Sequence, residues 1–473
     1  MSDNASSIAS PSITGQFAVA RAHATGRIGL FTGIGLVIAN MIGSGVLTTA
    51  GYMADSLGPL WILAAWAIGG VVALAGAAVY AQLAEEMPES GGEYRYLSKL
   101  VHPYAGYVAG WTSLLVGFSA PVAMAGLAAG AYLSVLVGVD ATIAAIVIIA
   151  AITAVHGLHL RTSSTTQDVL VAIKIVLLIA FVAVGLATGS NALPQWQPPQ
   201  QMGLAATVGS FFNSLVFIGF CYSGWNAVTY VAAEFRDPRR DVWRAMWMGT
   251  LVVIAVYLAV NWVFVANLTP ADLARVKTED EKLTLGHVVL QHLVGETGAL
   301  AMSSVVLVAL VSSLSAMTLV GPRVYAAMAR DGYLPKFFDG KDDAPPLASV
   351  VLQSAVAVAL VLTQKFSVLL NNAGSVLTLT SMAAVIALVV RRSAKLSGAV
   401  KIAAATYVAF SSWALLFSIK ETPSTLLWAL AIFALAAAGY KMARRTNGGP
   451  SVQAPVVAQV DSGPRSLSEI NRL

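Results

Sequence analysis

A series of long apolar stretches, following one another from about residue 28 to residue 442, restricts the fold more than any other feature. A helix of roughly 20 apolar residues crosses the ~30 Å hydrocarbon core of a bilayer, and only helices satisfy all backbone polar groups within one segment. We therefore predict an all-α membrane protein with twelve transmembrane helices. The stretches lie near 28–50, 58–83, 106–136, 141–158, 167–188, 207–232, 243–266, 299–328, 347–363, 367–390, 399–419 and 424–442.

The charge content agrees with burial in lipid. Only 11% of the 473 residues are charged, whereas a soluble domain carries roughly 25%. A soluble protein this poor in charge could not cover its core with polar surface. The net charge of +5 would suggest nucleic acid in a soluble protein, but in a membrane protein basic residues usually set the topology. We expect the lipid bilayer as a partner and no nucleic acid.

The basic loop residues predict the orientation. An even number of spans places both tails on one side, and tails inside leave few basic residues outside, so the positive-inside rule favours cytoplasmic termini in the inner or plasma membrane. The residues left outside are Arg275, Lys277, Lys282, Lys365 and Lys420. The predicted organisation is a polar tail at 1–27, helices 1–10 at 28–390, helices 11–12 at 391–446, and a flexible tail at 447–473.

The sequence lacks the residue patterns of an enzyme or a metal protein. Cys221 is the single cysteine, so no intramolecular disulfide or cysteine-based zinc cluster can form. There is no His-Glu-x-x-His run, no Gly-x-Ser-x-Gly elbow and no acidic pair within a span. We therefore predict neither catalysis nor a bound metal or cofactor.

Two of the predicted helices contain glycines near their centres, within residues 40–46 of the first span and 220–226 of the sixth. Glycine costs about 1 kcal/mol relative to alanine inside a helix. Taken alone, either group could be a small-residue packing face. The two become more informative together, because spans 1 and 6 are equivalent positions if helices 1–10 form a 5+5 inverted repeat. Paired interrupted helices of this kind indicate the central site of a transporter.

Interrupted helices also predict the charge of the ligand. The N-terminal end of a half-helix presents free N–H groups to an anion, and the freed carbonyl groups nearby can face a cation. A site with both features suits a zwitterion, and an α-amino acid is the simplest small one.

At these residues the chain resembles the amino acid–polyamine–organocation superfamily, and more narrowly the L-type amino acid transporters and their bacterial relatives. The resemblance extends over about residues 28–390. The motifs that carry it are IGSG at 42–45, EMPESGGEY at 86–94, FCYSGWN at 220–226, EFRDP at 234–238, and PRVY at 322–325 with ARDGYLP at 329–335.

The resemblance implies a role for each matched residue. Ser44 and Gly45 would hold the substrate carboxylate, and the Phe220 ring would close over the substrate as a gate. Trp225 and Asn226 would support the interrupted sixth helix. The α-ammonium group would contact the carbonyl groups of Met41, Phe220 and Ser223, with Cys221 close by. The complete set of predicted substrate-binding residues is Met41, Ile42, Gly43, Ser44, Gly45, Phe220, Cys221, Ser223 and Gly224.

One lysine lies within a predicted span. Lys174 is about two turns inside the fifth apolar stretch and could extend toward the headgroups. A charge at this depth is more often functional. The resemblance implies that its ammonium bridges spans 1 and 8, where sodium-driven relatives hold a sodium ion, so we predict that transport is independent of sodium.

Carboxylates are expected only near helix ends. Glu85, Glu86 and Glu234 sit at the inner ends of spans, and no Asp or Glu lies at the centre of one. Arg323, at the inner end of span 8, is predicted to pair with a cytoplasmic-side carboxylate and to help close an inner gate.

These observations favour a sodium-independent exchanger or uniporter for neutral L-amino acids that works by alternating access. The alternatives are a cationic amino acid or polyamine exchanger and a proton-coupled symporter. Eukaryotic L-type members bond a heavy chain through a cysteine between spans 3 and 4, but the corresponding loop here, Gly138–Asp140, has none. We therefore expect no disulfide-linked heavy chain.

Overall fold

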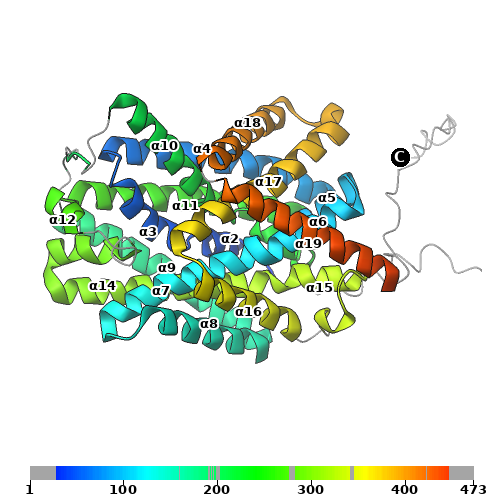
Figure 1. Ribbon diagram of the computed structural model, residues 1–473, viewed down its shortest axis with the longest axis horizontal. Coiled ribbons are helices and arrows are strands. Elements are labelled where there is room, and N and C mark those ends of the chain that lie inside the picture. The colour runs from blue at the N-terminus through cyan, green and yellow to red at the C-terminus, as the bar shows by residue number, and fades with distance from the viewer. Residues whose placement is uncertain are drawn as a thin grey trace, which may run out of the picture.

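The computed structural model describes residues 28–446 except for residues 159, 190, 191, 193, 195, 199–202, 276–282, 341–345 and 422. The tails predicted at 1–27 and 447–473 lie outside the described residues. Within the described part the protein is all-helical, and most of its long helices run along the long axis of the molecule (Figure 1). No strand occurs there, and a single isolated bridge pairs Ile28 with Phe235.

Eight helical segments of the described chain are long and apolar enough to cross a membrane, so the protein is a multi-pass membrane protein. Four shorter apolar helices accompany them, at Leu30–Met41, Ala141–Gly157, Leu347–Thr363 and Leu426–Lys441. The helices are α2 (Leu30–Met41), α3 (Ser44–Met53), α4 (Pro59–Glu86), α5 (Glu93–Leu100), α6 (Pro103–Thr112), the π-helix η1 (Ser113–Ser119), α7 (Ala120–Val137), α8 (Ala141–Leu158), α9 (Leu160–Thr188), α10 (Leu204–Cys221), the 3₁₀ segment η2 (Ala227–Glu234), α11 (Pro238–Asn267), α12 (Pro270–Arg275), α14 (Leu285–Val320), α15 (Pro322–Arg330), η3 (Lys336–Phe338), α16 (Leu347–Thr363), α17 (Phe366–Arg392), η4 (Ser393–Lys395), α18 (Gly398–Glu421) and α19 (Ser424–Thr446).

Several elements differ from the apolar pattern. The stretch at 299–328 is divided between α14 and α15, because Pro322 lacks an N–H group and cannot continue the hydrogen-bond ladder. Helix α9 begins at Leu160, several residues before the apolar stretch that predicted it. Helix α5 was not predicted at all, since it is short and amphipathic and has no membrane-length apolar run.

The third apolar stretch is a composite of three elements. Helices α6 and α7 are joined by η1, whose hydrogen bonds run from residue i to i+5 and which therefore contains an extra residue per turn. Such turns occur frequently at functional sites. In this protein Gly117 and Phe118 of η1 line an internal cavity.

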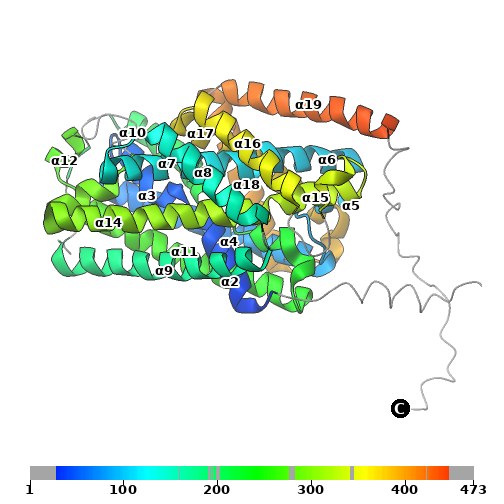
Figure 2. The same ribbon diagram turned by 90° about the horizontal axis from the view of Figure 1, so that it is seen from below.

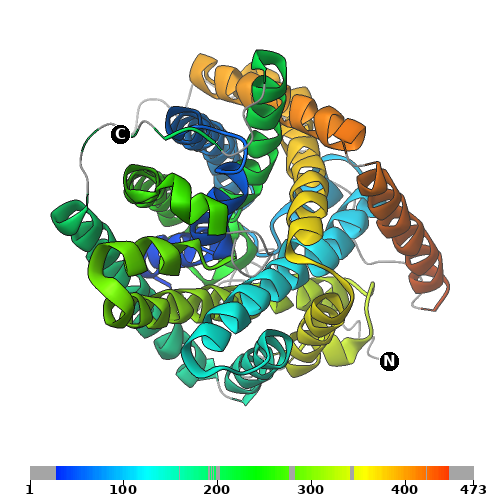
Figure 3. The ribbon, with the colours of Figure 1, turned by 60° about the vertical axis from the view of Figure 1, so that its left-hand side comes forward.

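Helices α2 and α3 lie in the middle of the bundle, where α2 packs against α11 and α3 packs against α10. The outer helices expose apolar side chains suited to lipid, such as Val71, Val176, Val390 and Leu416. Helix α19 lies on the outer edge of the molecule (Figures 2 and 3), where it contacts α6 and α17. Figure 3 shows α19 in red, away from the blue helices at the centre.

A close approach of α7 to α8 depends on Gly130, because a Cβ atom there would lie 2.1 Å from the Ala141 carbonyl oxygen. We expect Gly130→Ala to destabilise the protein by about 1–3 kcal/mol through overpacking. The apparent melting temperature of the purified protein in detergent measures this. Gly209→Ala is the matched control, since no atom lies within 4 Å of its added Cβ. Equal melting temperatures for the two variants would contradict the packing argument.

Candidate functional site

The first interruption lies between α2 and α3. Helix α2 ends at Met41, and α3 begins at Ser44. Between them Ile42 has φ −74° and ψ 83°, and the extended Gly43 precedes the first residue of α3. The Gly43 N–H group donates to the Met41 carbonyl oxygen at 2.8 Å, a tight turn that replaces the helical pattern. The first N–H groups of α3 and the last carbonyl groups of α2 are therefore free of intrahelical partners.

The second interruption follows α10, which ends at Cys221, while η2 begins at Ala227. Gly224 has φ +98°, a conformation that side chains with a Cβ rarely adopt. A Cβ at Gly224 would also lie 2.9 Å from the Asn40 carbonyl oxygen. The two interruptions are thus in direct contact, and glycine is required both by its dihedral angles and by that contact.

One phenol connects the ends of both helices. The Tyr257 hydroxyl group on α11 is 2.5 Å from the Met41 carbonyl oxygen and 2.9 Å from the Cys221 carbonyl oxygen. Tyr257 is completely buried, and its hydroxyl hydrogen is shared between these two carbonyl oxygens, of which that of Met41 also accepts from the Gly43 N–H group. Sequence analysis missed this residue, because a tyrosine in an apolar helix carries no motif.

The Lys174 ammonium contacts other carbonyl groups at the end of α2. Lys174 on α9 is completely buried, and its Nζ donates to the Ala39 carbonyl oxygen at 3.2 Å and the Ile42 carbonyl oxygen at 2.8 Å. It also donates to the Ser313 hydroxyl of α14 at 2.7 Å. The Ser313 hydroxyl in turn donates to the Ile42 carbonyl oxygen. The ammonium therefore connects α2 to α14 inside the bundle.

Two adjoining cavities contain most of the predicted substrate-binding residues. A small cavity of ≈ 20 Å³ lies between the interruptions, and a larger one of ≈ 100 Å³ extends beside η1, η2, α17 and α18. Phe220 and Ser223 line both. The predicted residues that line at least one of the two are Met41, Gly43, Gly45, Phe220, Cys221, Ser223, Gly224, Trp225 and Asn226.

Ile42 and Ser44 are the two predicted residues outside that list, and Cys221 and Gly45 within it lie in close contact. Ile42 lines neither cavity and faces Lys174 with its carbonyl oxygen. The Ser44 side chain lies outside the described residues. Cys221 is buried, and its Sγ lies 3.2 Å from the Thr49 hydroxyl oxygen on α3. Gly45 lies close against it, because a Cβ there would be 2.5 Å from the Cys221 Sγ.

A buried carboxylate in the larger cavity also escaped the sequence analysis. Glu93, the first residue of α5, lines this cavity although it belongs to a loop motif and not to a span. Its Oε1 accepts from the Asn226 Nδ2 at 2.6 Å, so Asn226 is held by α5. Trp225 packs edge-on against Tyr80 on α4, at 4.7 Å between ring centroids. The signal for Glu93 was the GGEY sequence, which places a carboxylate directly after two glycines.

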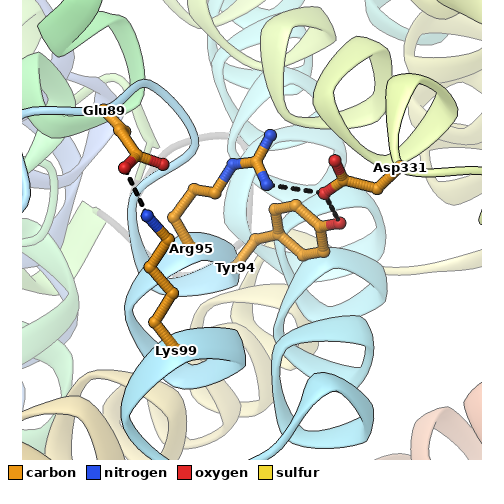
Figure 4. Close-up of polar contacts among 5 residues, drawn as sticks. All are labelled: Glu89, Tyr94, Arg95, Lys99 and Asp331. Atoms are coloured by element: carbon orange, nitrogen blue, oxygen red, sulfur yellow. Dashed lines mark hydrogen bonds and ion pairs between the residues drawn. The ribbon is translucent and has the colours of Figure 1, made fainter. Parts of the chain in front are cut away.

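Ion pairs join several elements near the predicted cytoplasmic ends. Arg323 pairs with Glu234 at 2.6 Å, as predicted, so α15 is tied to the end of η2. Figure 4 shows a second group, in which Arg95 and the Tyr94 hydroxyl of α5 both contact Asp331 beyond α15. Burial and the Asp331 carboxylate raise the pKa of Tyr94, so its hydroxyl remains a donor.

The other labelled pair in Figure 4 joins the Lys99 ammonium to Glu89 and stays within the loop and α5. Both side chains are partly exposed, and exposed pairs of this kind contribute little, typically ~0–1 kcal/mol. Among the described residues, no group of three His, Cys, Asp or Glu side chains could hold a metal ion.

Comparison with known protein families shows which family the chain belongs to. The model of the family described as "Amino acid permease" matches residues 28–456. The chain belongs to the amino acid permease family. This result confirms the resemblance found in the sequence and agrees with the expectation that the protein is a transporter rather than an enzyme.

Individual relatives of this permease are amino acid transporters by name. The present chain is 29% identical over 278 residues to the b(0,+)-type amino acid transporter 1 of Rattus norvegicus, and the match covers 56% of this chain and 55% of that protein. It is 26% identical over 333 residues to the Large neutral amino acids transporter small subunit 2 of Mus musculus, covering 65% and 59%. It is also 26% identical over 324 residues to the Serine/threonine exchanger SteT of Bacillus subtilis (strain 168), covering 65% and 69%. The chain thus spans little more than half the length of the mammalian relatives that it matches.

The contact between Gly224 and the Asn40 carbonyl can be tested by substitution. We expect Gly224→Ala to lower the apparent melting temperature and to impair the site, because strain at a positive φ costs about 1–3 kcal/mol and the added methyl meets the Asn40 carbonyl. Gly219→Ala in α10 is the control, since its Cβ would meet nothing within 4 Å. Thermal unfolding in detergent compares the two. A Gly224→Ala variant as stable as Gly219→Ala would mean that the two segments do not touch.

Proposed function

We propose that this permease is a sodium-independent exchanger or uniporter for neutral L-amino acids that works by alternating access. The observation that carries the proposal is the contact between two interrupted helices, α2–α3 and α10–η2, around a cavity lined by their backbone. Free N–H groups at the start of α3 suit a carboxylate, and carbonyl groups at the ends of α2 and α10 suit an ammonium. The names of the three relatives support an amino acid as the substrate.

We further propose that the chain forms twelve spans with a 5+5 inverted repeat, in which interrupted spans 1 and 6 are equivalent. The four shorter apolar helices would complete the eight long ones. We place the protein in the inner or plasma membrane. The distribution of its basic residues favours an orientation in which both termini are cytoplasmic. In this orientation the Arg323–Glu234 pair lies on the cytoplasmic side, and its separation would accompany inward opening.

In the proposed site, Ser44 and Gly45 hold the substrate carboxylate through backbone N–H groups. The α-ammonium contacts carbonyl groups of Met41, Phe220 and Ser223. The Met41 carbonyl oxygen already accepts from the Tyr257 hydroxyl and from the Gly43 N–H group, and the Phe220 carbonyl oxygen accepts from the Ser223 N–H group. Because a carbonyl oxygen has two lone pairs, the Met41 carbonyl would release one of its donors when the substrate binds. The Phe220 ring, which lines both cavities, closes over the bound molecule.

We also propose that the protein works without a disulfide-linked heavy chain. Cys221 is the only cysteine of the chain, and it is buried beside Gly45. A thiol in this position cannot reach the partner of a surface disulfide, which requires about 4.4–6.8 Å between Cα atoms. Purification of the protein alone, followed by uptake in proteoliposomes, tests this directly.

Lys174 generates a prediction about ion dependence. Its ammonium occupies the space between α2 and α14 and bonds the carbonyl groups that a sodium ion would need. We expect uptake by wild-type proteoliposomes to be unchanged when sodium is replaced by choline. Lys174→Ala should reduce uptake strongly while the protein remains expressed. The Ala39 carbonyl loses its Lys174 donor, at a cost of about 1–3 kcal/mol, whereas the Ile42 carbonyl keeps the Ser313 hydroxyl.

Lys401→Ala serves as the control for this substitution, because Lys401 is exposed on α18. Uptake that requires sodium in the wild-type protein would contradict the proposed role of Lys174.

The carboxylate site generates a second prediction. Each charge-assisted bond to a carboxylate contributes roughly 1.5–3 kcal/mol. Removal of the carboxylate should therefore weaken binding about tenfold or more. The measurement is inhibition of labelled amino acid uptake by the matching amine and by the α-amino amide. If either analogue competes as well as the parent amino acid, the substrate is recognised elsewhere and an amine or polyamine becomes the better candidate.

A further inference from the structure

Four arginines lie close together at the start of α11. They form the arginine cluster, which consists of Arg236, Arg239, Arg240 and Arg244. The first precedes the helix, and the other three belong to its first two turns. Arg244 is half-buried, and the other three are exposed. In the proposed orientation this end of α11 is cytoplasmic, where basic residues are expected from topology alone. What distinguishes these four is their surroundings.

Within the part of the chain that the structure describes, no carboxylate forms an ion pair with the arginine cluster. Other arginines near the same end of the bundle do have an acidic partner. They are Arg95, Arg323, Arg330 and Arg392. Asp237 and Asp241 lie between the clustered arginines, so four positive and two negative charges leave residues 236–244 with a net charge of +2. Asp237 is engaged as the cap of α11, because its carboxylate accepts from the Arg240 N–H group at 3.3 Å. The cluster therefore presents positive charge that the described residues leave unneutralised.

An exposed apolar face of α11 begins at the arginine cluster. Arg240, Arg244, Met248 and Leu251 follow one another at intervals of three or four residues, so they share one face of the helix. Met248 and Leu251 are both exposed. At 1.5 Å per residue, Arg240 and Leu251 are about 16 Å apart along the helix, which is about half of the ~30 Å hydrocarbon core. This face thus changes from cationic to aliphatic over the depth of one leaflet.

Aromatic side chains mark the level between the two parts. The Arg244 guanidinium lies over the ring of Trp243, 5.5 Å from its centroid, and this tryptophan is exposed. The isolated parallel bridge lies just before α2 and α11, so the two helices start side by side and run in the same direction. A Cβ at Gly33 of α2 would lie 3.0 Å from the Ala245 Cβ. Phe31, two residues before Gly33 and 86% exposed, is therefore at about the level of Trp243.

A ligand that fits these surroundings needs an anionic head and an apolar chain. The guanidinium fork forms paired hydrogen bonds with phosphate oxygens, and basic side chains next to a span attract anionic lipids. Exposed aromatic rings favour the boundary between headgroups and acyl chains. A soluble anion would satisfy the arginines alone, whereas a phospholipid with a net negative charge matches all three levels.

We propose that the arginine cluster binds the phosphate group of an anionic phospholipid, whose acyl chains lie along the exposed face of α11. Phosphatidylglycerol has the required chemistry. Bound lipid would hold the connection between η2 and α11, because Arg236 follows Glu234 by two residues and Glu234 pairs with Arg323. The site is separate from the cavities between the interrupted helices, since none of the four arginines lines either cavity.

The experiment titrates the full-length protein in detergent with phosphatidylglycerol, and separately with phosphatidylcholine of the same chain length. Native mass spectrometry measures the dissociation constant of the first bound lipid. At low salt the wild type should bind phosphatidylglycerol about tenfold or more tightly than phosphatidylcholine. Each basic residue near an anionic lipid contributes about fivefold in affinity. Arg240→Gln combined with Arg244→Gln should therefore weaken phosphatidylglycerol binding about tenfold to thirtyfold and leave phosphatidylcholine binding unchanged.

Lys395→Gln combined with Lys401→Gln is the matched control. It removes the same charge from two exposed residues near the start of α18, at the same end of the bundle. Its affinity for phosphatidylglycerol should stay within about twofold of the wild-type value, because these lysines lie outside the cluster. Equal affinity of the wild type for the two lipids overturns the proposal. An equal loss of affinity in the arginine and lysine variants also overturns it, since net charge and not a site would then explain binding.

Two further measurements keep the test decisive. If the glutamine variant does not fold, Arg240→Lys combined with Arg244→Lys keeps the charge and should keep the preference for phosphatidylglycerol, with affinity lowered about twofold to fivefold by loss of the paired hydrogen bonds. Loss of the preference in this variant, with an unchanged melting temperature, overturns the proposal. Inorganic phosphate is the second probe. If it displaces phosphatidylglycerol at millimolar concentration, the site binds soluble anions and the lipid assignment is wrong. All of these readouts remain valid if the protein transports no amino acid in proteoliposomes.

Discussion

The need to satisfy backbone polar groups within an apolar bundle governs the centre of this protein. A lipid-embedded helix bonds its own N–H and carbonyl groups, because the hydrocarbon of a bilayer supplies no partners, but two helices here stop and restart. Tyr257 serves one carbonyl group from each interruption. Lys174 and Ser313 serve the Ile42 carbonyl. The side chains that appear at first to be polar exceptions in apolar helices are therefore the groups that permit the interruptions.

Much of the fold could be predicted because membrane-spanning helices have a minimum length and composition. Every predicted apolar stretch contains a helix, and Gly43 and Gly224 lie in the segments that follow α2 and α10. The division at Pro322 followed from a known property of proline but was hidden within a long apolar run. Helix α5 could not be found by the same criterion, since its amphipathic pattern resembles that of an ordinary loop helix.

The candidate site was predictable only where backbone chemistry determines it. The motif glycines indicated the two segments, and Lys174 stood out as a charge in an apolar stretch. Tyr257 carries no motif, and Glu93 stood out only as part of the GGEY sequence, because the contacts of both residues join segments distant in the sequence. Glu93 lies 133 positions from Asn226, its partner in η2. Even the pairing of Arg323 was predicted without its partner, since several carboxylates lie near the ends of the spans.

The π-helix η1 has an evolutionary consequence for the third span. A turn of this kind holds one residue more than an α-helical turn, so removing a residue within Ser113–Ser119 would leave a regular α-helix with α6 and α7 still presenting their present faces. Removing a residue elsewhere in Pro103–Val137 would rotate one half of the span by about 100° relative to the other. The segment that contains Phe118 is therefore the place in this span where a residue can be lost while both flanking helices keep their packing.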